Sequence, residues 1–280
     1  SEKFFNTKKA LITLIASSLV VIVSLGIRQT FGLFFFDFNA DLNISISHFG
    51  FVIGLQLLMW GVFSPIFGFI TDRYGGATAI FVGFLFYLAG LFLFYSGLNT
   101  GYLFTLTIGL LIGIGLGGTA ISIPVSVVAK HFPSSNRTIA TGIVTCAGSF
   151  GFFVSPLLVR YSLIEIGWEI TILYFCFLLG IGLITALFIS TPKTPVGNND
   201  NNNQTAKEAL IEAFNNKSFI FLTLGFFVCG WHIALVATHI PKYMMDKGLP
   251  DWTAAMILAL IGVFNMLGTI SSGYLSTRYS

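Results

Sequence analysis

Charged residues are scarce in this sequence of 280 residues, and that scarcity excludes most classes of protein. Aspartate, glutamate, lysine and arginine together make up 9% of the chain, hydrophobic residues make up 55%, and the mean hydropathy is +0.87. Soluble domains carry roughly 25% charged residues, so this composition excludes a soluble globular fold. The formal net charge of +3 is too small for a basic nucleic-acid surface. The chain is therefore an integral membrane protein whose surroundings are the lipid bilayer.

Cysteine and the common catalytic motifs are also rare or absent. The three cysteines, Cys146, Cys176 and Cys229, all fall inside apolar runs, where a thiol is usually a small packing residue. No G-x-x-x-x-G-K-S/T sequence occurs, and no polar segment is long enough for a nucleotide-binding domain. A membrane enzyme needs a cluster of nucleophile, acid or metal ligands at one depth, and the sequence contains none. We therefore expect no enzymatic activity, no cofactor and no metal site.

Long apolar runs are what the sequence has in abundance. Each run has about 20 residues, the length with which a helix crosses about 30 Å of hydrocarbon. None shows the strict two-residue alternation of outer-membrane strands, so an all-α membrane protein is expected. The predicted spans are residues 10–36, 49–70, 77–97, 102–129, 138–159, 170–190, 218–240 and 253–276.

A polar segment separates the first six predicted spans from the last two. Residues 191–217 carry two Thr-Pro steps and an asparagine-rich run that is too polar to pack or to insert into the bilayer. We interpret residues 1–190 as an N-terminal six-helix bundle, 191–217 as a cytoplasmic linker and 218–280 as the start of a C-terminal bundle. Within the linker, residues 207–214 are compatible with a short surface helix.

The distribution of lysine and arginine predicts the orientation of the chain. These residues are enriched in cytoplasmic loops, whereas acidic residues contribute little to orientation. With the N-terminus inside, ten lie on the cytoplasmic side and three on the outer side. The ten are Lys3, Lys8, Lys9, Arg73, Lys130, Arg137, Lys193, Lys207, Lys217 and Arg278, and the three are Arg160, Lys242 and Lys247. We therefore expect a multi-pass protein of the plasma membrane, the inner membrane in a bacterium, with a cytoplasmic N-terminus.

A short motif after the second predicted span recurs near the end of the chain. The pairs, each separated by 205 residues, are Gly68 and Gly273, Arg73 and Arg278, and Tyr74 and Tyr279. A repeat of this length indicates two structurally equivalent halves. Adding the period to the end of the sixth span predicts a complete chain of about 395 residues with twelve helices, of which this sequence contains the first eight.

The first copy of the motif resembles the loop signature G-x-x-x-D-R-x-G-R-R/K between helices 2 and 3 of the major facilitator superfamily. Gly68, Asp72, Arg73 and Gly75 match the signature, whereas a glycine and an alanine replace its final basic residues. The resemblance implies the major facilitator fold, here the six-helix N-terminal half plus the first two helices of the C-terminal half. It also implies that the loop holds one face of a transporter closed. Gly68, Asp72, Arg73 and Gly75, with Arg278 in the second copy, are therefore the predicted gating residues.

Two further segments resemble the bacterial branch of this family that is related to monocarboxylate carriers. They are residues 26–32 in the first span, Gly-Ile-Arg-Gln-Thr-Phe-Gly, and residues 229–241 around the seventh span. This narrower resemblance implies secondary active transport of a small organic anion.

Glycine and proline predict how some of the spans pack. Gly109, Gly113 and Gly117 in the fourth span form a ridge of small residues that allows neighbouring backbones to approach closely. Pro65 and Pro124 predict kinks in the second and fourth spans. These residues are expected to shape the bundle rather than to touch a substrate.

Arg28 is the most informative polar residue, because no acidic residue occurs in any predicted span. An arginine at the centre of a membrane helix costs about 2.5 to 3.5 kcal/mol, so an unpaired one predicts an anion from outside the chain. A substrate carboxylate fits, since a guanidinium offers a planar pair of donors. Two alternatives remain open: Arg28 snorkels to the outer headgroups near Asp37, or it pairs with a residue outside this sequence.

Other polar residues within the spans are candidates for the same cavity, which in folds of two such halves lies near the bilayer midplane. The repeat places His232 at nearly the same depth as Arg28, and His239 follows two turns later on the same face. Histidine binds a carboxylate or carries a proton, although a neutral ring bonded to a backbone carbonyl is an equally good interpretation. The predicted substrate-binding residues are Arg28, Gln29, Gln56, His232 and Asn265, and the predicted proton-coupling residues are His232 and His239. Each of the amides is equally suited to a structural bond between helices.

Together these features predict a secondary active transporter that moves a small organic anion, a mono- or dicarboxylate, by alternating access. The expected partners are the lipid bilayer, the anion, and a proton or counter-anion, with no nucleic acid. Two alternatives remain open. One is an exporter of hydrophobic or drug-like compounds, against which a midplane arginine argues, and the other is a non-transporting membrane sensor on the same fold.

Overall fold

The computed structural model describes residues 8–189, 206–250 and 252–279, and every regular element in these ranges is helical. The first six spans are formed by α1 (Lys8–Gln29), η1 (Phe31–Phe34), α2 (Phe35–Leu42), α3 (Ile46–Tyr74), α4 (Gly76–Tyr95), α5 (Gly101–Phe104), η2 (Thr105–Leu111), α6 (Ile112–Thr119), α7 (Ser122–His131), α8 (Ser134–Glu165) and α9 (Gly167–Ala186). The later elements are α10 (Ala206–Asn215), α11 (Lys217–Asp246) and α12 (Trp252–Tyr279). The predicted all-α fold is confirmed.

Eight runs of these helices are long and apolar enough to cross a membrane, which confirms the predicted number of spans within the described ranges. Large apolar side chains remain exposed along them, such as Phe177 at 67% and Leu158 at 62%. A bilayer accepts such surfaces because its hydrocarbon is as apolar as the side chains themselves. The short helix α10 agrees with the surface helix expected within the linker.

An aromatic cluster closes the end of the first bundle at which α2 lies. The ring centroid of Phe38 is 5.1 Å from that of Phe94, 5.9 Å from Phe104 and 5.4 Å from Trp168. The Trp168 indole also donates a hydrogen bond to the Asp41 carboxylate at 2.6 Å. Aromatic pairs contribute about 0.5 to 1.5 kcal/mol beyond their area burial, so this cluster ties α2, α4, α5 and α9 together.

Glycines allow α6 to pass between α3 and α4 at very short range. A Cβ on Gly113 would lie 2.6 Å from the backbone oxygen of Gln56 on α3. On the opposite face of α6, a Cβ on Gly115 would lie 2.7 Å from the backbone oxygen of Gly83 on α4. Side chains do not fit at such distances, so the predicted ridge of small residues is confirmed as the surface that lets these helices meet.

Two of the spans are interrupted inside the bundle. The first is broken at Thr30, whose backbone N–H (3.1 Å) and hydroxyl (2.7 Å) both bond to the carbonyl of Ile27 and tighten the chain into η1. In the fourth span, α6 ends at Thr119, and Ala120 is extended with ψ −166° before α7 begins. Pro124 explains this break, since it has no N–H for the Ala120 carbonyl and its ring collides with that carbonyl. The predicted kink at Pro124 is therefore a complete interruption.

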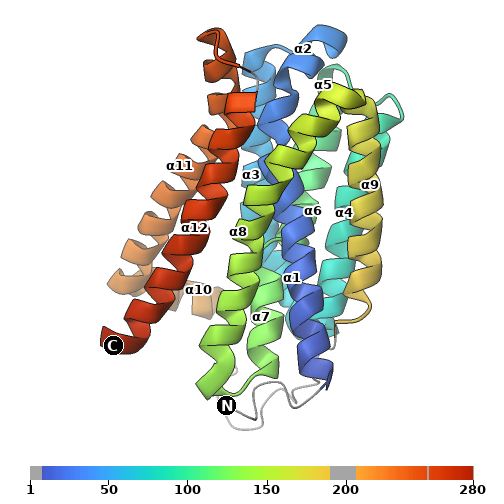
Figure 1. The fold of residues 1–280 in the computed structure, drawn as a ribbon. Helices are drawn as coiled ribbons and strands as arrows, with labels where there is room; N and C mark the ends of the chain where they lie inside the picture. Colours follow the sequence, from blue (N-terminus) through green and yellow to red (C-terminus); the bar gives the residue numbers. More distant parts are fainter. Residues whose placement is uncertain (1–7, 190–205, 251, 280) are drawn as a thin grey trace.

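The helices of the second bundle, α11 and α12, touch the first bundle along only part of their length (Figure 1). A Cβ on Gly32 of η1 would lie 2.3 Å from the Ala237 carbonyl of α11, and one on Gly262 of α12 would lie 2.4 Å from the backbone nitrogen of Phe153 on α8. Toward the other end, side chains of α11 and α12 are exposed, as Phe221 is at 72%. The two bundles are therefore joined at the end where α2 lies and separate toward the opposite end.

We predict that Gly115→Ala destabilises the protein. The added methyl group would also lie 2.7 Å from the backbone nitrogen of Tyr87, so α4 and α6 must move apart. Overpacking of this kind costs about 1 to 3 kcal/mol. Thermal unfolding of the purified protein in detergent measures the effect as a lower melting temperature.

The matched control is Gly180→Ala on α9, where nothing lies within 4 Å of the added carbon. Alanine is the better helix former by about 1 kcal/mol, so the control is expected to keep or raise the melting temperature. Equal melting temperatures for the two variants would contradict the close packing of α4 on α6.

Candidate functional site

Arg28 lies in the last turn of α1, and its side chain is only 5% exposed. Ser24, one turn earlier on the same face, places its hydroxyl 2.7 Å from that of Thr119 at the end of α6. Tyr87 of α4 donates its phenol to the Ser24 carbonyl at 3.4 Å. Arg28 is thus held among α1, α4 and α6, close to the interruptions of both the first and the fourth span.

Three hydroxyl groups at or beside Ser24, which lies one helical turn from Arg28, have defined donor and acceptor roles: those of Ser24, Thr119 and Tyr87. Thr119 donates its proton to the Gly115 carbonyl at 3.0 Å, so in the pair with Ser24 it is the acceptor. The phenol proton of Tyr87 goes to the Ser24 carbonyl. This network orients the surroundings of the guanidinium but adds no negative charge to them.

Several polar atoms at this site have no hydrogen-bond partner within the described ranges. They include the buried Nε of Arg28 and both side-chain amide atoms of Gln29. The C-terminal end of a helix favours a cation by about 0.3 to 1 kcal/mol, and by up to about 2 kcal/mol when partly buried. That is less than the about 2.5 to 3.5 kcal/mol that a membrane-centre arginine costs. The site therefore holds a positive charge that the described residues compensate only in part.

The burial of Arg28 removes one alternative for its role. A snorkelling arginine keeps its guanidinium in water while its methylene stem covers apolar surface. At 5% exposure, the Arg28 side chain is enclosed by the first bundle and does not reach outward in this way. Contact with a substrate remains a prediction.

Gln56 lies across α6 from Tyr87, because α3 and α4 pack on opposite glycine faces of that helix. Its side-chain amide is fully buried and donates to the Ile108 carbonyl at 2.9 Å. Ile108 belongs to η2, a π-helical segment of seven residues, and such segments bond their backbone in a wider register than an α-helix. Gln56 secures this segment, while its Oε1 has no partner among the described residues.

The two histidines predicted for proton coupling lie on α11. His232 is exposed on the described chain. His239 is also exposed, and its Cε1 would be 3.8 Å from a Cβ placed on Gly50 of α3, so it lies where the two bundles meet. Neither imidazole forms a hydrogen bond within the described ranges.

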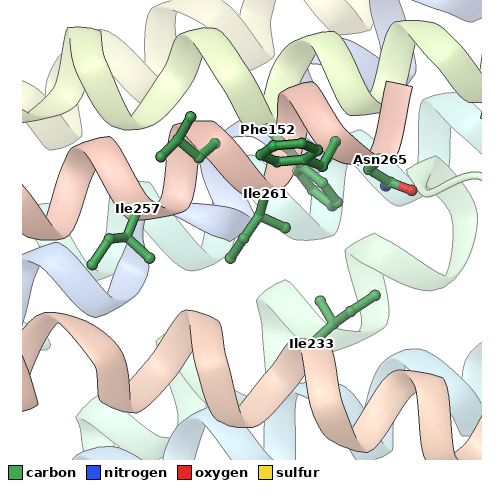
Figure 2. Close-up of a pocket in the computed structure, with 7 residues that line it drawn as sticks. Phe152, Ile233, Ile257, Ile261 and Asn265 are labelled. Atoms are coloured by element: carbon green, nitrogen blue, oxygen red, sulfur yellow. The ribbon is translucent and has the colours of Figure 1, made fainter. Parts of the chain in front are cut away.

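Asn265 lines a cavity of about 430 Å³ between α8, α11 and α12. Figure 2 shows Ile233 of α11 across the cavity from Ile261 of α12, with Phe152 of α8 beside them. Asn265 supplies the amide among otherwise apolar lining residues. The structure therefore brings Arg28 and Gln29 together and places Gln56, His232 and Asn265 on other surfaces.

The signature loop between the second and third spans has the turn that its sequence predicts. Gly75 has φ +95°, a conformation that other residues rarely adopt, and α4 begins directly after it. A Cβ on Gly76 would lie 2.0 Å from a methyl carbon of Val127 on α7, so this position has no room for the basic residue of the family signature. The loop therefore packs directly against the end of the fourth span.

The charged residues of the loop have partners that the sequence does not reveal. Asp72 accepts a hydrogen bond from Lys130 of α7 at 2.8 Å, and their side chains are 74% and 33% exposed. Arg73 lies over the Tyr74 ring at 5.5 Å and pairs with no carboxylate among the described residues. Gly68 has nothing within 4 Å of its added Cβ. The side chain of Arg278 lies outside the described part of the chain.

Tyr87 and Lys130 are the functional candidates that the sequence did not single out. Tyr87 is fully buried. A polar hydroxyl in the middle of an apolar span is the feature of the sequence that indicates a functional candidate at this position. Lys130 was assigned only to the cytoplasmic charge set. Its pairing with Asp72 spans 58 residues of sequence and depends on how α7 packs beside α3.

An all-helical membrane bundle with interrupted spans and a partly compensated internal cation is typical of polytopic carrier proteins. The sequence model of the family described as "Major Facilitator Superfamily" matches residues 16–280. The chain therefore belongs to this superfamily, whose members are transporters.

Known relatives differ in what their names say they carry. The chain is 24% identical over 277 residues to an agnestins efflux protein of Paecilomyces divaricatus, covering 97% of this chain and 61% of that protein. It is 23% identical over 253 residues to a hexuronate transporter of Bacillus subtilis, covering 84% of this chain and 57% of that protein. The chain thus spans about three fifths of the length of these relatives.

Among solved structures, a D-xylose-proton symporter superposes with a TM-score of 0.65 at 15% sequence identity. The match covers 96% of this chain and 69% of that one. At this identity the likeness shows a shared fold, and it agrees with the arrangement of spans described above.

We predict that the Asp72–Lys130 pair acts on conformation and contributes little to stability. Exposed ion pairs contribute about 0 to 1 kcal/mol, so Asp72→Asn should barely change the melting temperature. Uptake of the carried solute into proteoliposomes should fall in the single variants Asp72→Lys and Lys130→Asp, because each places two like charges side by side. The double variant that exchanges the two residues should recover it, because the ion pair is re-formed in reverse.

Failure of the exchanged variant to recover uptake, with both proteins folded, would show that Asp72 acts through a group other than Lys130. Arg137→Asp is the matched control, since Arg137 is an exposed cation on the same side of the protein. It is expected to leave uptake unchanged.

Proposed function

We propose that this protein is a secondary active transporter that moves a small organic anion, a mono- or dicarboxylate, by alternating access. The observation that carries the proposal is the buried Arg28, which no carboxylate neutralises within the described ranges. The proposed location is the plasma membrane, the inner membrane in a bacterium, with the N-terminus in the cytoplasm. The orientation is supported by the placement of lysine and arginine in the loops.

A carboxylate suits the Arg28 site on charge and on geometry. A guanidinium presents parallel N–H donors that match the two oxygens of a carboxylate. Beside it, the unpartnered amide of Gln29 offers a donor and an acceptor for a hydroxyl or carbonyl group of the same molecule. Interrupted spans are the usual place for such sites in transporters, because chain breaks free polar backbone groups inside the membrane.

The way in which the two bundles meet supports alternating access. They approach through the backbone at Gly32 and at Gly262, where no side chain separates the helices. Contacts of this kind allow one rigid body to rock against another. The loop that carries Gly68, Asp72, Arg73 and Gly75 lies at the opposite end of the first bundle from α2. We assign it the role of closing that end, together with Arg278.

The relatives support an anion without deciding which one. The hexuronate transporter is named for a sugar acid, which carries a carboxylate. The agnestins efflux protein supports the second candidate, export of hydrophobic or drug-like compounds, and the apolar cavity beside Asn265 favours it as well. A buried cation is poorly suited to neutral or cationic cargo, so we place organic anions first. The narrower assignment to the monocarboxylate branch rests on residues 26–32 and 229–241.

We predict that Arg28→Gln lowers carboxylate uptake into proteoliposomes by about tenfold or more, because a hydrogen bond to a charged group contributes about 1.5 to 3 kcal/mol. The uptake rate of Arg28→Lys is expected to lie between those of the wild type and Arg28→Gln, since an ammonium keeps the charge and loses the planar pair of donors. Initial rates for labelled mono- and dicarboxylates provide the measurement.

Arg137→Gln is the control for loss of an arginine far from the buried site and should transport normally. Wild-type rates in both Arg28 variants, for a carboxylate that the protein does carry, would overturn the assignment of Arg28 to substrate. Binding of carboxylates without uptake would instead favour the sensor alternative.

We predict that His232→Gln flattens the pH dependence of uptake, because histidine titrates between about pH 5 and pH 8. Uptake rates across this range, with and without an imposed proton gradient, give the profile. His239→Gln tests the second histidine in the same way. His48→Gln is the control, since His48 is bonded to Thr105 at 2.9 Å within the first bundle. An unchanged profile removes the histidine concerned from proton coupling and favours anion exchange.

A further inference from the structure

The cavity between α8, α11 and α12 has a chemistry that the Arg28 site does not share. Its lining residues are Phe152, Ile233, Ile257, Leu260, Ile261, Phe264 and Asn265. All but Asn265 are apolar, and the side-chain amide of Asn265 forms no hydrogen bond within the described ranges. The cavity is partly open, since Leu260 and Phe264 in its lining are 45% and 67% exposed, and Asn265 places one polar group at its edge (Figure 2).

The size of the cavity is that of a ligand pocket and far exceeds a packing defect. It holds about 430 Å³. Ligand pockets measure about 300 to 1,000 Å³ and are mostly lined by hydrophobic and aromatic side chains. A dry cavity of about 150 Å³ already takes up benzene. An aromatic ring with a short alkyl chain therefore fits.

The position of the cavity ties it to the moving parts of the protein. Phe152 belongs to the first bundle, whereas Ile233 and Ile261 belong to the second. The neighbouring residues Phe153 and Gly262 form the tight backbone contact between the bundles. Any rocking of one bundle on the other changes the shape of this cavity, as is required of a surface that binds a carried molecule.

We propose that this cavity binds the apolar part of the carried anion, so that the protein prefers carboxylates bearing an aryl or branched alkyl group over small or hydroxyl-rich ones. The inference rests on the proposed function, since it assigns a second contact surface to the same cargo. Arg28 then recognises the charge, and the cavity recognises the hydrocarbon. Asn265, at the edge of the cavity, offers a donor and an acceptor for a polar substituent of the cargo.

The test is equilibrium binding to the purified protein in detergent micelles, measured by isothermal titration calorimetry and corrected with protein-free micelles. The probes are two matched pairs, propanoate with 3-phenylpropanoate and malonate with benzylmalonate. The uncharged probe is 3-phenylpropanamide. A single methylene group in a hydrophobic pocket changes affinity about tenfold or more, so each phenyl-bearing anion should bind the wild-type protein at least about tenfold more tightly than its parent.

Two variants of Ile233 test the cavity itself. Ile233→Trp fills it, and Ile233→Ser makes its wall polar, so a folding failure in one leaves the other informative. Both should abolish the preference for the phenyl group and leave the binding of propanoate and malonate unchanged. Leu173→Trp on α9 is the matched control, since Leu173 is 44% exposed on a helix that does not line the cavity. It should keep the full preference.

The outcomes separate this inference from the proposed function. No phenyl preference in the wild type, or a preference that survives both Ile233 substitutions, overturns the cavity assignment. If Arg28→Gln still weakens the binding of both carboxylates in each pair in that case, the proposed anion transport stands and only the cavity assignment is overturned. If 3-phenylpropanamide binds as tightly as 3-phenylpropanoate and the Ile233 variants weaken both, the cavity is a binding site but the organic-anion function is wrong. Arg28→Gln is expected to weaken both members of each pair and to preserve their ratio.

Discussion

A positive charge enclosed among apolar helices is the constraint on which the rest of the structure depends. Arg28 lies in the last turn of α1, and the described residues offer it the end of a helix in place of a carboxylate. Such a charge is costly in a membrane, and the interruptions at Thr30 and Ala120 add freed backbone groups beside it. In the proposed function, the carried anion completes this site.

The surrounding bundle is rigid enough to hold this arrangement. Gly113 and Gly115 allow α3, α6 and α4 to meet through their backbones, and the rings around Phe38 join four elements at one end. Between the two bundles, α12 packs along α8 and α11 packs on η1, with the closest backbone approaches at Gly262 and Gly32. Backbone-to-backbone contact at these two glycines, with no side chain between the helices, is compatible with the rocking of one bundle on the other by which carriers of this architecture expose one site to two sides of a membrane.

The proposed polar and apolar recognition sites occupy different places in this molecule. The charged site is enclosed by helices of the first bundle, whereas the cavity lined by Ile233 and Ile261 lies between the bundles. A low-dielectric surrounding strengthens the attraction between a buried cation and an anion. The two surfaces are therefore complementary for a molecule with a charged end and a hydrocarbon end.

Hydropathy alone predicted the eight spans, the absence of strands among the described residues and the short helix in the linker. It succeeds because the bilayer requires each span to satisfy its own backbone hydrogen bonds, so length and composition of a local segment are sufficient. The turn at Gly75 and the ridge around Gly113 were predictable for a similar reason, since each depends on one residue type at one position. Pro124 indicated a distortion, but its extent depends on neighbours that replace the lost bond.

Which polar residues share a site was decided only by the tertiary structure. Tyr87 reaches the Ser24 carbonyl across 63 residues of sequence, and Asp72 reaches Lys130 across 58. Such pairs depend on the rotation and offset of packed helices, which a pattern along one helix does not contain. For the same reason Gln56, predicted to lie with Arg28, is bonded to Ile108 on the other side of α6. The sequence determined which residues are buried in the membrane, and the packing of helices determined which of them meet.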